Sequence, residues 1–329
     1  MKRNKVFNVL FSLVICLLGI NVWTKQLQKP IVVKPKPVAV VEKRSNVAQK
    51  INPVVKPVNV ASINITYGVS THQNKRPYQE DRFAHTTIGN GQFFGIYDGH
   101  GGAHVSERLA QNLHNYFVKA TGTIKAQFIR AFDQIDYQAQ QEWPDEGSTA
   151  LAIFIKNNEL HFAWVGDTRA VLERNDKVGF ATDDHKPDRK DEKERIERAG
   201  GKIRMQGVWR VNGLAVSRSI GDAMCKKQGI GQIIAIPEYS AIRLTPNNHF
   251  AIMASDGLWD VMNNEEVVAM VNKALRDKKS LNSIAQMLQN AAIKRGSNDN
   301  ITVCIIKFDW QVQPRESLLR RWWDWLRGE

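Results

Sequence analysis

The chain has 329 residues, of which 43% are hydrophobic and only three are cysteines, so it is neither a wholly disordered chain nor a disulfide scaffold. Its formal charge of +13 comes mostly from residues 1–60, which hold 11 Lys and Arg and one acidic residue, whereas the rest holds 35 basic and 32 acidic residues. This balance excludes a basic groove in the folded part, and we expect no nucleic-acid partner.

An apolar stretch spans residues 6–23 and follows three basic residues. As a helix it would extend about 27 Å, slightly less than the hydrocarbon core of a bilayer, about 30 Å. A cleaved signal peptide and an uncleaved membrane anchor both fit this pattern. The absence of an A-x-A-like cleavage site favours the anchor, and we assign residues 1–25 to an anchor or signal segment.

A linker is predicted in residues 26–60. This segment holds five of the eleven prolines among Val and Lys, with no aromatic residue and no helical period. Such a composition is typical of an extended, polyproline-like spacer.

Residues 61–310 have the composition of one folded domain of the α+β class. Apolar runs predict strands at 93–97, 149–156, 159–165, 169–173, 249–254 and 301–308. Helical spacing predicts helices at 103–119, 125–141, 189–199, 264–276 and 280–294. Only Asn157 and Asn158 separate the second and third strands, which indicates a hairpin. Strands that arrive in hairpins, with helices in separate blocks, favour antiparallel sheets with helices on their outer faces.

Acidic residues stand where the predicted strands begin or end. Asp98 follows one strand, Asp256 follows another, and Asp299 precedes the last, while Glu80 and Asp81 lie in a polar segment further upstream. Each alone is typical of a turn. Several carboxylates at the edge of a core would repel one another unless divalent cations shared them, and oxygen ligands suit Mg²⁺ or Mn²⁺. The lack of a Cys/His cluster disfavours zinc.

Eight motifs occur in an order that resembles the metal-dependent protein phosphatase family (PPM, protein phosphatase 2C type). They are R-P-Y-Q-E-D (76–81), Y-D-G-H-G-G (97–102), G-S-T-A (147–150), W-V-G-D-T-R-A (164–170), D-D-H-K-P (183–187), G-L-A-V-S-R-S-I-G-D (213–222), A-S-D-G-L-W-D (254–260) and S-N-D-N-I-T (297–302). The resemblance covers about residues 63–308. It implies a four-layer α/β/β/α sandwich of two antiparallel sheets flanked by helices.

The resemblance also implies a site with two metal ions, Mg²⁺ or Mn²⁺. Asp98 would bridge the two ions, with the Gly99 carbonyl on one of them. Asp256 and Asp299 would complete the other.

Further metal roles follow from the same resemblance. Glu80 would act through metal-bound water and Asp81 from behind the ligands. Asp184 and Asp260 match positions associated with a third, weaker ion.

Two residues are implied to act directly on the substrate. Arg76 would bind the phosphate oxygens, and His100 would be the general acid. The implied activity is that of a protein serine/threonine phosphatase, which hydrolyses phosphoserine and phosphothreonine with a metal-activated water. A phosphoprotein-binding adaptor without turnover is the alternative.

Some residues near these motifs have a structural interpretation of equal or greater weight. The segment 166–169 is expected to be a turn beside the site. The charged helix 189–199 is expected to present a solvated face, although the resemblance places it in a flap beside the catalytic cleft. Trp209 and Arg210 could line that cleft or pack against the domain.

The C-terminal segment 311–329 lies outside the resemblance. It contains Trp322, Trp323 and Trp325 with flanking arginines, and its apolar residues share one helical face. A membrane-interface helix and a helix packed on its own domain are equally compatible with this pattern.

A membrane location follows from these segments. We expect a membrane-tethered monomer with an N-terminal single-pass anchor through residues 6–23, a further membrane contact through residues 315–329, and a domain that faces the cytosol. Export after signal cleavage is the alternative. The expected partners are phosphoserine and phosphothreonine proteins.

Overall fold

The computed structural model describes residues 62–311 and Arg327. One antiparallel sheet has the strand order β1-β14-β13-β7-β8. Its strands are β1 (Ser62–His72), β14 (Ile301–Gln311), β13 (Phe250–Ala254), β7 (Arg169–Arg174) and β8 (Lys177–Ala181). Strands from both ends of the described chain therefore pair with each other, β1 with β14, over the full length of β1.

A second sheet has the order β11-β4-β3-β5-β6-β12, and β2 also pairs with β3. Its strands are β11 (Ile220–Gly221), β4 (Gly147–Ser148), β3 (Gly91–His100), β5 (Ala150–Lys156), β6 (Glu159–Val165), β12 (Glu238–Arg243) and β2 (Asp81–Ile88). All of these pairings are antiparallel. The predicted hairpin is present as β5 and β6, because Asn157 and Asn158 adopt positive φ angles of 52° and 59°.

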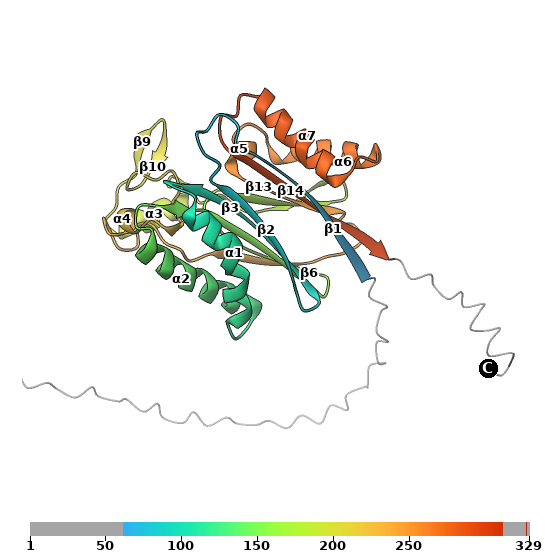
Figure 1. Cartoon of the computed structure of the whole chain (residues 1–329), viewed down its shortest axis with the longest axis horizontal. Coiled ribbons are helices and arrows are strands. Elements are labelled where there is room, and N and C mark those ends of the chain that lie inside the picture. The colour runs from blue at the N-terminus through green and yellow to red at the C-terminus, as the bar shows by residue number, and fades with distance from the viewer. Residues whose placement is uncertain (1–61, 312–326, 328–329) are drawn as a thin grey trace, which may run out of the picture. The chain divides into compact units, whose positions relative to one another are not determined.

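Helices cover the outer faces of both sheets, as Figure 1 shows, and the predicted four-layer α+β sandwich is confirmed. On the second sheet lie α1 (His104–Lys119) and α2 (Ile124–Glu142). On the first sheet lie α5 (Asp256–Trp259), α6 (Asn264–Arg276) and α7 (Leu281–Lys294). In α1, residues Leu109 and Leu113 are fully buried, as the spacing of its apolar residues predicts.

A third core region fills the space between the two sheets. In β3, Phe94 and Ile96 point into this region, whereas Phe93 and Tyr97 point towards α1 and α2. This alternation follows from the two-residue period of a strand that is buried on both faces. The first sheet contributes residues such as Met253 from β13. The sheets are therefore joined by packing, and the ends of their strands lie at fixed positions relative to each other.

A segment between β8 and β12 contains short elements that pack beside the sheets. They are α3 (Lys190–Arg198), β9 (Arg204–Gln206), β10 (Val208–Arg210) and α4 (Ala223–Lys226). The α3 helix is not simply a solvated face, because Glu192 is buried and binds Arg195 and Arg218, each at 2.7 Å. We call residues 204–210 the flap hairpin.

The predicted membrane location is corrected by the structure. Among the described residues, no helix has both the length and the apolar character needed to cross a membrane. The predicted anchor at 6–23, the linker at 26–60 and the tail at 311–329, apart from Gln311 and Arg327, lie outside the described residues.

Candidate active site

A cavity of about 680 Å³ lies where elements of both sheets end. Six acidic residues of the described chain line it, and they come from different parts of the sequence. They are Asp98 near the end of β3, Asp167 between β6 and β7, Asp188 just before α3, Asp256 and Asp260 at the two ends of α5, and Asp299 just before β14. The predicted convergence of Asp98, Asp256 and Asp299 is thus seen in the structure.

The backbone of Asp98 is held by Thr149, which lies between β4 and β5. Its backbone N–H donates to Thr149 Oγ1 at 3.0 Å, and its carbonyl accepts from the Thr149 N–H at 2.9 Å. Burial, followed by repulsion from Asp81 and Asp256, raises the pKa of Asp98 well above its usual value. This carboxyl group therefore resists ionisation without a positive partner.

Asp256 lies in a similar environment. Burial raises the pKa of its carboxyl well above the usual value, and the neighbouring Asp167 and Asp260 add to the shift. Lys186 acts in the opposite direction and forms an ion pair with Asp167. One lysine does not compensate this group of carboxylates, because the pKa of Asp260 is also raised, first by burial.

Asp81 lies behind Asp98, because the two residues are directly paired across β2 and β3. Its Oδ2 accepts a hydrogen bond from Ser255 Oγ at 2.8 Å, whereas its buried Oδ1 has no hydrogen-bond partner within residues 62–311. Burial, with a smaller effect from Asp299, raises the pKa of Asp81 to about 6.

This donor set fits a divalent cation site. Several partly buried carboxylates are crowded together, burial and repulsion raise the pKa values of Asp98 and Asp256, and the buried Asp81 leaves one oxygen without a partner within residues 62–311. Bound cations would remove both the repulsion and the desolvation cost. Carboxylate and carbonyl oxygens are the ligands that Mg²⁺ and Mn²⁺ prefer.

The remaining predicted residues occupy different positions. Gly99, Arg76 and His100 line the cavity. Arg76 Nε lies 3.1 Å from Asp299 Oδ1, and both side chains are about half exposed. The Glu80 side chain does not line the cavity, but its carbonyl accepts from the Gly99 N–H at 3.3 Å.

Asp184 is not brought to the cavity. It is bound through both of its carboxylate oxygens by Arg169, at 2.9 Å and 2.7 Å. Asp260, the other residue predicted for a third ion, does line the cavity. Its neighbour there is Asp167, which was expected to lie in a structural turn.

Asp167 and Lys186, which line the cavity, and Asp222, which contacts His100, were not predicted as site residues. Asp167 follows the end of β6 just as Asp256 follows the end of β13, so the strand-end signal could have identified it. Asp222 binds His100 Nε2 at 2.9 Å and 3.0 Å. Burial opposes ionisation of both partners, but their contact prevails, raising the pKa of His100 and lowering that of Asp222.

The flap hairpin forms one wall of the cavity. Four of its residues line the cavity: Met205, Val208, Trp209 and Arg210. Of the two places expected for Trp209 and Arg210, the structure therefore shows the cleft. Met205 is 58% exposed and Val208 is 50% exposed. In Figure 1 the hairpin of β9 and β10 stands beyond the sheets, near the end of β3.

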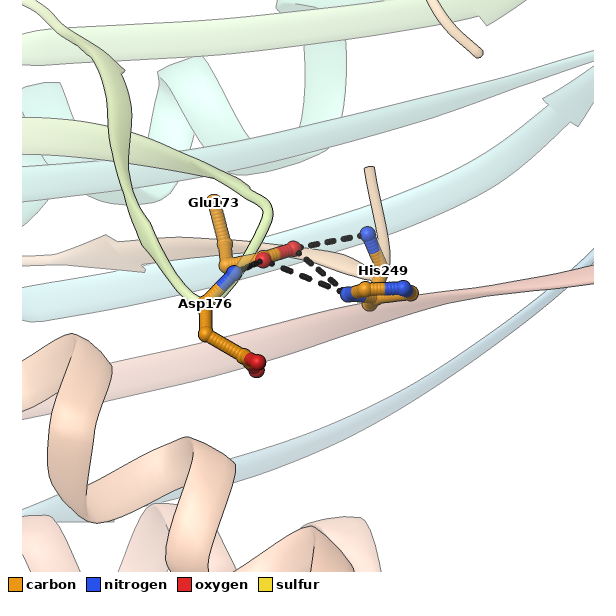
Figure 2. A group of neighbouring side chains, drawn as sticks. All are labelled: Glu173, Asp176 and His249. Atoms are coloured by element: carbon orange, nitrogen blue, oxygen red, sulfur yellow. Dashed lines mark hydrogen bonds and ion pairs between the residues drawn. The ribbon is translucent and has the colours of Figure 1, made fainter. Parts of the chain in front are cut away.

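A second group with metal-ligand chemistry lies at the turn between β7 and β8. Glu173, Asp176 and His249 place one ligand atom each within 4.8 Å of one another (Figure 2). The buried Glu173 carboxylate already accepts from the His249 N–H at 2.8 Å and from the Asp176 N–H at 2.5 Å. This group could hold an ion, but its hydrogen bonds also explain it as a brace for the turn.

The two-sheet sandwich and its carboxylate-lined cavity are typical of metal-dependent phosphatases. Comparison with known proteins supports the same class. The family model for protein phosphatase 2C matches residues 67–301. "Probable protein phosphatase 2C 69" of Arabidopsis thaliana is 39% identical over 255 residues, which is 74% of this chain and 70% of the relative. "Probable protein phosphatase 2C 11" of the same plant is 40% identical over 266 residues, 76% of this chain and 68% of the relative.

Solved structures show the same fold. A serine-threonine phosphatase 2C from Toxoplasma gondii superimposes with a TM-score of 0.66 at 21% identity, over 76% of this chain and 96% of that one. A second phosphatase from that organism gives 0.68 at 22% identity, over 77% and 97%. The chain belongs to the protein phosphatase 2C family. It is a protein serine/threonine phosphatase, and its substrates are phosphoproteins.

Proposed function

We propose that the cavity hydrolyses phosphoserine and phosphothreonine with two Mg²⁺ or Mn²⁺ ions. The residues that would hold the ions are Asp98, the Gly99 carbonyl, Asp256 and Asp299. The observation that carries this proposal is the convergence of partly buried carboxylates on one cavity, where burial and neighbouring carboxylates raise the pKa values of Asp98 and Asp256. When bound, the ions supply positive charge that lowers the pKa of a water and attracts the phosphate.

The geometry also supports places for the other acidic residues. We assign Asp167 and Asp260 to the rim of the same centre, since both line the cavity. Asp81 supports Asp98 from behind, and the Glu80 carbonyl fixes the backbone of Gly99. Asp184, which is bound to Arg169, is assigned a structural role in this proposal.

Two residues act on the phosphate ester itself. The Arg76 guanidinium is exposed at the cavity and can exchange its contact with Asp299 for the phosphate oxygens. His100 gives a proton to the oxygen of the leaving serine or threonine, which is a poor leaving group without one. We further propose that residues 61–310 form the whole phosphatase domain and that it acts as a monomer, which sedimentation equilibrium tests.

Replacement of the central carboxylates tests the proposal. In the full chain, Asp98→Asn and Asp256→Asn should each reduce phosphate release from phosphothreonine peptides with Mn²⁺ by about 10³-fold or more, because several kcal/mol of transition-state stabilisation is lost. A chelator should abolish the activity of the unaltered protein.

Asp309→Asn is the matched control, since Asp309 on β14 pairs with Lys307 away from the cavity. It should retain full activity. If the two cavity variants remained as active as this control, the assignment of the site would be refuted. An unaltered protein that bound phosphopeptides without releasing phosphate would instead be an adaptor.

A further inference from the structure

The His100 ring is fixed by a buried carboxylate from a distant part of the sequence. His100 Nε2 lies 2.9 Å from Asp222 Oδ1 and 3.0 Å from Oδ2. Asp222 is 2% exposed, whereas His100 keeps 29% of its side chain exposed and lines the cavity. Since Nε2 is directed towards Asp222, Nδ1 is the ring nitrogen that is free to meet a substrate.

Asp222 is itself held firmly. Its carboxylate accepts from Ser219 Oγ at 2.6 Å, and its backbone N–H donates to the Glu146 carbonyl at 2.8 Å. Its backbone has a φ of 55°, in the left-handed region that few side chains other than Asn and Asp tolerate. A residue in this conformation persists where the surroundings fix it, as they do here.

Space for the Asp222 carboxylate exists only because residue 147 is a glycine. A Cβ on Gly147 would lie 2.2 Å from Asp222 Oδ2, well inside the contact distance. Gly147 lies on β4, where it is paired with His100 of β3 on one side and with Gly221 of β11 on the other. The register of three strands therefore brings Asp222 and His100 together.

We propose that Asp222 is a positioning residue for catalysis, which holds His100 by Nε2 so that Nδ1 faces the leaving oxygen of the substrate. This inference rests on the proposed function. Asp222 does not line the cavity, so its contact with His100 does not depend on the proposed metal centre.

The proton transfer can be followed atom by atom. Water oxygen forms a bond to phosphorus while the bond from phosphorus to the serine or threonine oxygen breaks. The electron pair of that bond stays on the leaving oxygen, which takes the proton from Nδ1. The ring is then neutral and keeps its Nε2–H on Asp222. The proton that the water loses returns to Nδ1 through solvent, so the net reaction consumes one water.

The test compares two leaving groups in the full chain. Asp222→Asn keeps the size of the side chain and tolerates the left-handed φ, but it lacks the charge that fixes the ring and its proton. With phosphothreonine peptides, kcat should fall about 10²-fold with little change in KM. With p-nitrophenyl phosphate, whose leaving group needs no proton, kcat should change less than about threefold.

His100→Ala should show the same selective loss, and the double variant should lose no more than His100→Ala alone. Gly147→Ala, which keeps both members of the pair but pushes on the carboxylate, should give a smaller loss with the same selectivity. It serves as the second variant if Asp222→Asn fails to fold.

Asp136→Asn is the matched control. Asp136 accepts from the Gly221 N–H at 2.8 Å and so supports the same strand without contacting His100. It should leave the ratio of the two activities unchanged. Equal loss on both substrates, no loss on the peptide, or additive effects in the double variant would overturn the inference. Failure of the unaltered protein on both substrates would instead refute the proposed function.

Discussion

Asp81 is a buried carboxyl group whose ionised form has no positively charged partner within residues 62–311. It is 3% exposed, one of its oxygens has no partner within residues 62–311, and its pKa is raised by burial to about 6. Such a group lowers the stability of the protein whenever it is ionised. Its contribution can therefore be measured through pH.

The sign of this effect is set by the two states. The pKa of Asp81 is about 6 in the folded protein and 3.8 as its usual value, so the folded protein holds the extra proton between these pH values. Stability should fall by about 3 kcal/mol as pH rises through this window. In chelator, urea unfolding should show Asp81→Asn gaining stability relative to the unaltered protein over the same range.

Asp309→Asn, on β14 and away from the cavity, is the matched control variant for this series. A constant or reversed difference between Asp81→Asn and the unaltered protein would contradict the burial argument.

Sequence reasoning predicted site residues where a carboxylate stands at a strand end. Asp98, Asp256 and Asp299 were predicted because a carboxylate beside an apolar strand needs a partner, and all three line the cavity. Asp222 was not, because its role depends on which strand lies beside β4, a fact of three-dimensional pairing. Asp184 differs from its expected place for a similar reason, since the position of Arg169 decides its contact.

At the level of elements, α3 depends on one internal charge. Glu192 is buried and binds Arg195 and Arg218, and Ser217 Oγ donates to it at 2.5 Å. Although burial opposes ionisation, these partners lower the pKa of Glu192 below its usual value. The α3 helix is thereby fixed to the segment that continues into β11.

Glu192→Gln should lower the free energy of unfolding by about 3 kcal/mol, because two arginines lose their buried partner. Since the pKa of Glu192 is lowered in the folded state, this stabilisation is present above its usual value of 4.5 and is lost as pH falls below it. Chemical denaturation at pH 7 and at lower pH measures the difference.

Glu197→Gln removes the exposed partner of Lys193 on the same helix and should change stability by less than about 0.5 kcal/mol. Equal effects of the two variants would mean that the Glu192 network does not stabilise α3.

Most elements that sequence reasoning found have a strong apolar period. Helices α1, α2, α6 and α7, and also the highly charged α3, agree with their predicted ranges to within one residue. The strands β1 and β2 were missed because their residues are mostly half-buried or exposed, which weakens the apolar signal. The flap hairpin was missed because its strands are three residues long.

Across the described unit, the carboxylate-lined cavity is built from both sheets. Asp98 belongs to the second sheet, whereas Asp256 and Asp299 adjoin β13 and β14 of the first. Cations held by all three would bind the folded state alone and so stabilise it. The four-layer arrangement could be inferred from hairpins and helix blocks, but this joining of sheets could not.

Mn²⁺ at about 100 times its dissociation constant should raise the stability by about 2.7 kcal/mol, seen as a rise in Tm by calorimetry. Asp98→Asn should lose most of this rise. His249→Ala should keep it, since His249 belongs to the second acidic group near β7 and β8. If His249→Ala abolished the rise instead, the stabilising ion would lie in that second group.

The pairing of β1 with β14 has a consequence during synthesis. The nascent chain cannot close its first sheet until the segment that ends at Gln311 has left the ribosome. Asp299 emerges just ahead of that segment, so the last acidic residue of the cavity and the last strand arrive together. Incomplete chains therefore lack the assembled cavity, and under the proposed function dephosphorylation begins only with the finished fold.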